Sequence, residues 1–140
     1  MNLIEKLLSV DKATATEKET KKIKSKRLAK LVGEDAEITI TEISGRRYNE
    51  LQAMMYDRKG NRDAKGAYNL NLMCCVHGIK DPCLTDKTLM QHFGASTPKD
   101  LAEILFGLES AKIAEEILRL SGLGENSEDE ESVEEEVKNS

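Results

Sequence analysis

The chain has 140 residues, enough for one domain of ordinary size, and carries a formal net charge of −5. It has no tryptophan, three tyrosines and two phenylalanines, which argues against a nucleic-acid surface built on stacked aromatic rings. No stretch approaches the roughly 18 apolar residues of a membrane span, and the start MNLIEKLLSVDK lacks the features of a secretory signal. These features predict a cytosolic protein that does not enter a membrane.

The negative charge is concentrated at the C-terminus. Residues 125–140 read ENSEDEESVEEEVKNS and hold eight carboxylates and one lysine, a formal charge of −7. Residues 1–124 hold 18 acidic and 20 basic residues, a charge of +2, and the two parts sum to −5. Repulsion between the carboxylates and the scarcity of apolar side chains predict a disordered acidic tail over residues 125–140. A solubilising role is favoured for this tail over a dedicated docking role.

A short apolar helix is expected at the N-terminus. Leu3, Ile4, Leu7 and Leu8 form one face of two helical turns. Residues 11–22 contain no large apolar side chain and indicate a charged linker, so residues 1–22 are taken as one unit. A helix this short is marginal alone. It therefore either extends on an arm and offers its apolar face to a partner, or packs back on the body.

A basic segment and a strand follow the linker. Six basic side chains lie within ten positions: Lys21, Lys22, Lys24, Lys26, Arg27 and Lys30. They could form a nucleic-acid patch, but acidic residues on both sides dilute the field, and a lysine-protected edge strand is the better interpretation. Residues 36–43, AEITITEI, alternate between two faces and are rich in β-branched side chains, which predicts the clearest strand of the chain.

Two helices are expected next. Ser44 can cap a helix that begins directly after the strand. Residues 67–78 are apolar on two faces, which predicts a central, buried helix ending at Gly78. His77 falls in the last turn of that helix, where a protonated imidazole suits the helix dipole better than it suits a catalytic role.

The C-terminal half predicts a series of short helices. Thr85 can cap the first of them, and Thr97 followed by Pro98 marks the start of the next. Its apolar stripe changes phase near residues 107–110, which predicts a break there. A second stripe then follows, with Ile113, Ile117 and Leu120; a partner could use it, although core packing is favoured. The predicted fold is mostly helical α+β, with a small antiparallel sheet packed against a compact helical body.

The residues that could carry chemistry do not form a recognisable site. Cys74, Cys75 and Cys83 lie near His77 and His92, but their spacing matches neither a usual zinc site nor a disulfide framework, and buried thiols are expected. No glycine-rich phosphate loop, nucleophile elbow or H-E-x-x-H motif is present in the sequence. We therefore assign no catalytic, cofactor-binding or metal-binding residue and no small-molecule substrate, and expect a binding or assembly protein.

Three short segments carry a family resemblance: GRRYNELQ at residues 45–52, DPCL at 81–84 and TPKDLAEILF at 97–106. With the apolar N-terminal helix and the lysine-rich segment before them, their order resembles the XkdN-like family of phage tail assembly chaperones. The resemblance covers roughly residues 1–124 and places a tail assembly chaperone domain at 23–124. These segments look like structural signatures and not like catalytic motifs.

The resemblance implies a role without catalysis. Such chaperones are thought to coat the tape measure protein in the host cytoplasm while tail tube subunits polymerise around it, and to be absent from the mature virion. The implied partner is the tape measure protein, and the tail tube protein and a second copy of the chain are further candidates. The residues that such a partner would contact are the two apolar stripes: Leu3, Ile4, Leu7, Leu8, Ile113, Ile117 and Leu120.

A small DNA-binding phage or prophage regulator is the competing hypothesis. It would use the helices around residues 85–118 as a helix-turn-helix and residues 21–30 as an arm on phosphate. The body charge of only +2 and the lack of an obvious Arg, Asn and Gln cluster count against it.

Overall fold

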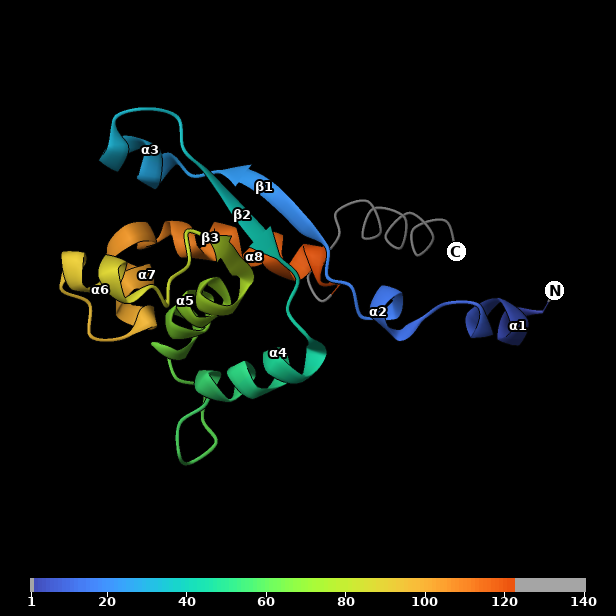
Figure 1. The fold of residues 1–140 in the computed structure, drawn as a ribbon. Coiled ribbons are helices and arrows are strands. Elements are labelled where there is room, and N and C mark those ends of the chain that lie inside the picture. Colours follow the sequence, from blue (N-terminus) through green and yellow to red (C-terminus); the bar gives the residue numbers. More distant parts are fainter. Residues whose placement is uncertain (1, 123–140) are drawn as a thin grey trace, which may run out of the picture.

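A computed structural model describes residues 2–122 of the chain (Figure 1). Its elements are α1 (Leu3–Leu8), α2 (Lys12–Ala15), β1 (Thr20–Lys24), α3 (Lys26–Val32), β2 (Glu37–Thr41), α4 (Gly45–Gln52), the 3-10 turn η1 (Ala53–Met55), α5 (Gly66–Gly78), β3 (Ile79–Asp81), α6 (Lys87–Phe93), α7 (Pro98–Phe106) and α8 (Glu109–Leu120). The acidic tail predicted over residues 125–140 lies outside the described residues.

The three strands form one antiparallel sheet in the order β1-β2-β3. Ile38 and Ile40 of the central strand β2 are fully buried, whereas Thr39 and Thr41 alternate with them and remain partly exposed. Ile23 of β1 pairs with Ile38, so it joins the same inner face. The strand predicted at residues 36–43 is confirmed, and the lysine-rich segment does begin with an edge strand.

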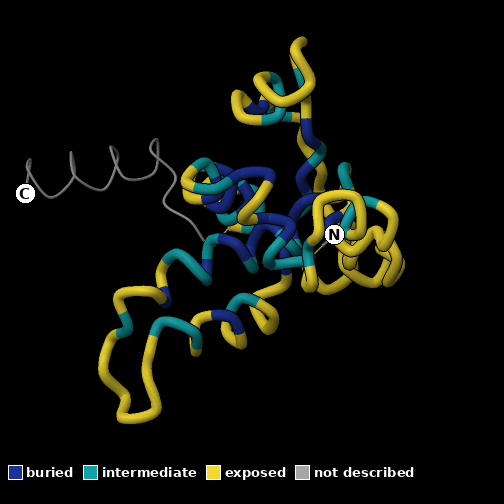
Figure 2. The backbone as a smooth tube through the Cα atoms, turned by 90° about the vertical axis from the view of Figure 1, so that its left-hand side faces the viewer, coloured by how far each residue is buried: buried dark blue, intermediate teal, exposed yellow. Residues whose placement is uncertain are grey.

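The inner face of the sheet packs on a helical body. Figure 1 shows α5 at the centre of this body, with α7 and α8 beside it, and α5 packs most extensively on α8. Most buried side chains belong to these helices and to β2, which gives one core (Figure 2). The prediction of a mostly helical α+β fold with a small antiparallel sheet is confirmed.

Several helix ends follow from local chemistry. The side-chain oxygens of Ser44 and Thr97 accept the backbone N–H groups of Arg47 and Asp100, so both predicted N-caps are confirmed. The predicted break is confirmed too, because α7 ends at Phe106 and α8 begins at Glu109.

Two local predictions are corrected by the structure. The short helix α6 is capped by Asp86 and not by Thr85, because the Asp86 carboxylate accepts the N–H of Leu89 at 2.8 Å. The expected linker at residues 11–22 is not irregular throughout. Asp11 caps the four-residue helix α2, and β1 begins at Thr20, where pairing with Thr41 of β2 orders the chain.

The central helix predicted over residues 67–78 is confirmed and ends at Gly78, and this glycine also has a role in packing. It is the last residue of α5 and lacks the positive φ of a glycine cap. A Cβ atom on Gly78 would lie 2.5 Å from Cδ1 and 2.6 Å from Cγ2 of the buried Ile117 on α8. The glycine therefore allows α8 to approach α5 closely.

Candidate functional site

The N-terminal arm, residues 2–16, carries the apolar face predicted for partner binding. No residue of α1 is buried, and Leu3, Ile4, Leu7 and Leu8 are 69%, 68%, 60% and 81% exposed. Figure 1 shows α1 and α2 leading away from the body, and Figure 2 shows the N-terminal segment exposed throughout. Of the two alternatives, an extended arm and a helix packed on the body, the structure has the arm.

The arm helix is held by its own capping group. Asn2 Oδ1 accepts the backbone N–H of Glu5 at 2.8 Å, and Glu5 lies in the first turn, where a carboxylate suits the helix dipole. A helix of six residues has little stability of its own. The cap therefore presents the four apolar side chains in a helical arrangement with no support from the body.

The second predicted stripe lies mainly in the core. Ile113 and Ile117 are 2% and 0% exposed and pack in the cluster that includes α5, and Leu120 is half-buried against that cluster. This corrects the expectation that Ile113 and Ile117 are open to a partner: the phase change near residue 107 turns both side chains toward α5. The core alternative describes them.

A second exposed apolar surface was not assigned from the sequence. Its members belong to α3, to α7, which packs on α3, and to the turn after α7, and they are called the end patch: Leu31, Val32, Ile104 and Leu108. The Arg27 guanidinium joins the two helices by donating to the Ile104 carbonyl oxygen at 3.2 Å. Leu108 is 86% exposed. In the sequence, Leu108 falls within residues 107–110, where the helix break was predicted.

The three cysteines have different environments. Cys74 and Cys75 are buried in α5; burial raises the pKa of the Cys74 thiol to about 11 and raises that of Cys75 further. Cys83 is exposed, and a hydrogen bond with the Thr85 hydroxyl, 3.1 Å away, lowers its pKa. Within residues 2–122 no three Cys, His, Asp or Glu side chains come together as metal ligands.

His77 does lie in the last turn of α5, as expected, but its charge differs from the expectation. Burial lowers the pKa of its imidazole, and the nearby positive charge of Arg47 lowers it further. The environment therefore favours the neutral ring, and a favourable interaction of an imidazolium with the helix dipole does not describe this site.

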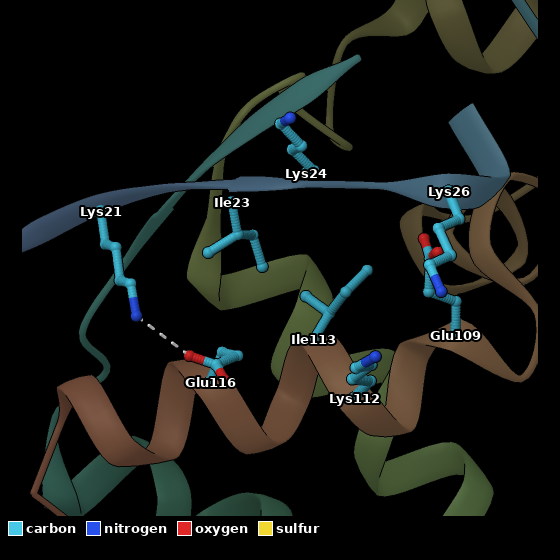
Figure 3. Close-up of a pocket in the computed structure, with 8 residues that line it drawn as sticks. All are labelled: Lys21, Ile23, Lys24, Lys26, Glu109, Lys112, Ile113 and Glu116. Atoms are coloured by element: carbon cyan, nitrogen blue, oxygen red, sulfur yellow. Dashed lines mark hydrogen bonds and ion pairs between the residues drawn. The ribbon is translucent and has the colours of Figure 1, made fainter. Parts of the chain in front are cut away.

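A groove of about 330 Å³ runs between β1 and α8. Ile23 of β1 and Ile113 of α8 point toward each other across it, as Figure 3 shows. The groove rim is charged. Lys21 Nζ pairs with Glu116 Oε2 at 3.2 Å near the C-terminal end of α8.

The other charged residues on the groove rim differ in whether they have a hydrogen-bond or ion-pair partner. Glu109 is occupied: its carboxylate accepts the Ser25 hydroxyl and, at 3.1 Å, the backbone N–H of Arg27. Lys26 and Lys112 are exposed and form no ion pair with any group in residues 2–122. The groove therefore combines an apolar floor with two exposed lysines that form no ion pair within the described part of the chain.

None of the helices within residues 2–122 has the length and apolar character needed to cross a membrane.

Comparisons with known proteins agree with this fold. The crystal structure of the protein YqbN is similar to this chain, with a TM-score of 0.53, 15% sequence identity, and coverage of 74% of this chain and 87% of YqbN. At that identity the likeness shows the fold alone. No curated protein matches the chain. Residues 4–138, nearly the whole sequence, match the family described as Phage XkdN-like tail assembly chaperone protein, TAC. The chain therefore belongs to the XkdN-like family of phage tail assembly chaperones.

Proposed function

We propose that this protein binds the tape measure protein and keeps it soluble during tail tube assembly, without turning over a substrate. It does so in the host cytoplasm and is not retained in the mature virion. Family membership supports a role in tail assembly. The single observation that carries the proposed mode of binding is the exposed apolar face of α1, which extends away from the body.

The chemistry of this face suits a helical client. An amphipathic helix commonly binds a partner through apolar residues that recur three and four positions apart, and Leu3, Ile4, Leu7 and Leu8 supply one short face of this kind. Full burial of one Leu or Ile side chain is worth about 1.5–3 kcal/mol relative to full exposure. Four such side chains, already partly covered, could therefore contribute several kcal/mol before the cost of ordering the arm.

The environments of the thiols and of His77 support a role without catalysis. The two thiols in α5 are buried and kept protonated, and the exposed Cys83 forms its hydrogen bond with the Thr85 hydroxyl. Nucleophilic catalysis by a thiol requires an adjacent base or a strongly activated thiolate. His77 belongs to α5 and is not hydrogen-bonded to any of these groups in the described structure.

Co-expression with the tape measure protein encoded beside this gene tests the proposal. We expect the wild-type chain to hold the tape measure protein in the soluble fraction and to elute with it. The double change Leu3→Asp with Leu7→Asp should abolish both effects, because it places two carboxylates on the apolar face. Moderate salt should weaken the wild-type complex little, since apolar contacts carry it.

A matched control separates charge from apolar contact. Lys6→Glu alters the arm's charge by the same two units as the double change but leaves all four apolar side chains in place, and it should retain the client. The proposal is wrong if the tape measure protein is equally insoluble with and without the wild-type chain. If Lys6→Glu and the double change fail alike, the apolar face is not the contact.

The DNA-binding regulator has less support. Lys21, one of the basic residues that it would place on phosphate, is paired with Glu116, and Arg27 is engaged with the end of α7. A gel-shift assay at low salt tests it directly, because phosphate contacts produce a binding constant that falls steeply with added salt.

A further inference from the structure

We propose that the groove between β1 and α8 holds the chain's own acidic C-terminal segment, residues 125–137. The segment would place an aliphatic side chain against the partly exposed Ile23 and its carboxylates against Lys26 and Lys112. This inference does not depend on the proposed client, because it concerns a contact of the chain with itself.

The groove selects for a segment that combines aliphatic and acidic groups. Its floor is the partly exposed Ile23 of β1, which faces the buried Ile113 of α8, and its rim carries Lys26 and Lys112 without ion-pair partners in residues 2–122 (Figure 3). Glu109 and Glu116 already accept hydrogen bonds from neighbouring groups. Lys26 and Lys112 are exposed to water, so a neutral occupant would gain no charge-assisted contact from them, whereas a carboxylate on either side of an aliphatic group would gain one with each lysine.

The C-terminal segment has this composition. Val133 and Val137 are the two large apolar side chains of residues 125–140, and carboxylates flank them in the run EESVEEEV. The net charge of −7 in these sixteen residues is opposite to that of the lysines on the groove rim. The segment thus offers the aliphatic group and the negative charges that the groove calls for.

The geometry of the chain brings this segment within reach. α8 forms one wall of the groove and ends at Leu120, and Gly122 has a φ of +77°, a left-handed conformation that turns the chain at the helix end. A helix of twelve residues is about 18 Å long. The eleven residues at 123–133 can span up to about 36 Å, so the segment can return along the whole of α8.

The tether makes a weak contact effective. Exposed ion pairs contribute little individually and are screened by salt. A segment joined to the groove wall by a few residues nevertheless has a high effective concentration at the groove. The contact is therefore reversible and salt-sensitive. The solubilising role favoured from the sequence took no account of a basic groove beside the start of the tail, because only the fold brings β1 and α8 together.

Zero-length carbodiimide cross-linking of the full-length chain tests the contact. The reagent joins a lysine to a carboxylate that touches it, and mass spectrometry of the monomer fraction locates each product. We expect Lys26 and Lys112 to join carboxylates of residues 128–136 several-fold more often than Lys59 and Lys87 do, which are exposed elsewhere on the body. At about 1 M salt, where the Debye length falls to about 3 Å, the preference should disappear.

A pair of matched variants supplies a second measurement. Lys26→Gln with Lys112→Gln should shift the backbone NMR signals of residues 125–137 in the full-length chain, and Lys59→Gln with Lys87→Gln should leave them unchanged. All four lysines are exposed, so both variants should keep the wild-type circular dichroism spectrum. Equal effects of the two variants, or cross-links spread evenly over exposed lysines, would overturn the proposal. So would cross-links that join isotope-labelled to unlabelled chains, which would identify a second copy as the occupant.

Discussion

Replacing Gly78 with alanine should destabilise the body by crowding the contact between α5 and α8. The added methyl group would lie 2.5, 2.6 and 2.9 Å from three side-chain atoms of Ile117, distances that atoms of folded proteins essentially never reach. Ile117 is fully buried, so it cannot swing into solvent to make room. Overpacking of a core costs about 1–3 kcal/mol.

The backbone itself does not oppose this substitution. Gly78 lies within α5 and has no positive φ, so alanine could gain up to about 1 kcal/mol there from its better helix propensity. The net expected loss is therefore about 1–2 kcal/mol, measured as a lower midpoint of urea unfolding followed by far-UV circular dichroism. Gly45→Ala is the control, because the space around a Cβ at Gly45 is open, and it should be neutral or slightly stabilising.

A double-mutant cycle assigns the loss to one contact. Ile117→Ala alone should cost about 2–5 kcal/mol through the cavity that it leaves. It also removes all three crowded atoms, so adding Gly78→Ala in that background should cost nothing, and the two changes should couple by at least about 1 kcal/mol. If Gly78→Ala destabilises both backgrounds equally, or neither, close packing against Ile117 is not the reason for this glycine.

Three further predictions follow from the thiols, the histidine and the arm. Iodoacetamide should label Cys83 first in the folded protein, whereas Cys74 and Cys75 should react only on unfolding; mass spectrometry would contradict this if all three reacted together. Because burial lowers the pKa of His77 in the folded state, the unfolded chain binds the proton more readily, and stability should fall as the pH drops below about 6.5. Urea unfolding at several pH values should show a weaker pH dependence in His77→Gln, and an unchanged dependence would remove His77 as its cause. Asn2→Ala should cost the arm helix about 0.5–2 kcal/mol and reduce co-purification of the client while leaving the urea midpoint of the body unchanged. Unchanged co-purification would show that the helical arrangement of the arm does not matter.

The features predicted correctly depend on interactions between near neighbours in the sequence. The strand β2 shows its alternation within five residues, and the caps Ser44 and Thr97 bond to groups three positions away. The choice between Thr85 and Asp86 was local too, but both residue types can cap a helix. The path of the chain into α6 decides between them, and no periodicity in the sequence reports that path.

The features that were missed depend on contacts between distant residues. The β1–α8 groove is bounded by Lys21 and Glu116, which are 95 positions apart, so no pattern in either segment indicates the other. The end patch was missed for a related reason. Apolar spacing in the sequence does not show whether another element covers Leu31 of α3 or Leu108 in the turn before α8. The same limit applies to the two predicted apolar stripes. α5 covers Ile113 and Ile117, whereas no described residue covers the apolar face of α1.

The division between arm and body has a consequence for how a client is held and released. α1 contributes no buried residue, so changes in its apolar face alter binding without altering the core. A six-residue helix is marginal alone, and a client that covers its apolar face must bear part of the cost of ordering it. The resulting affinity is lower than the same contacts would give on a rigid surface. For the proposed binding of the tape measure protein, this lower affinity would allow the client to be released without any conformational change in the body.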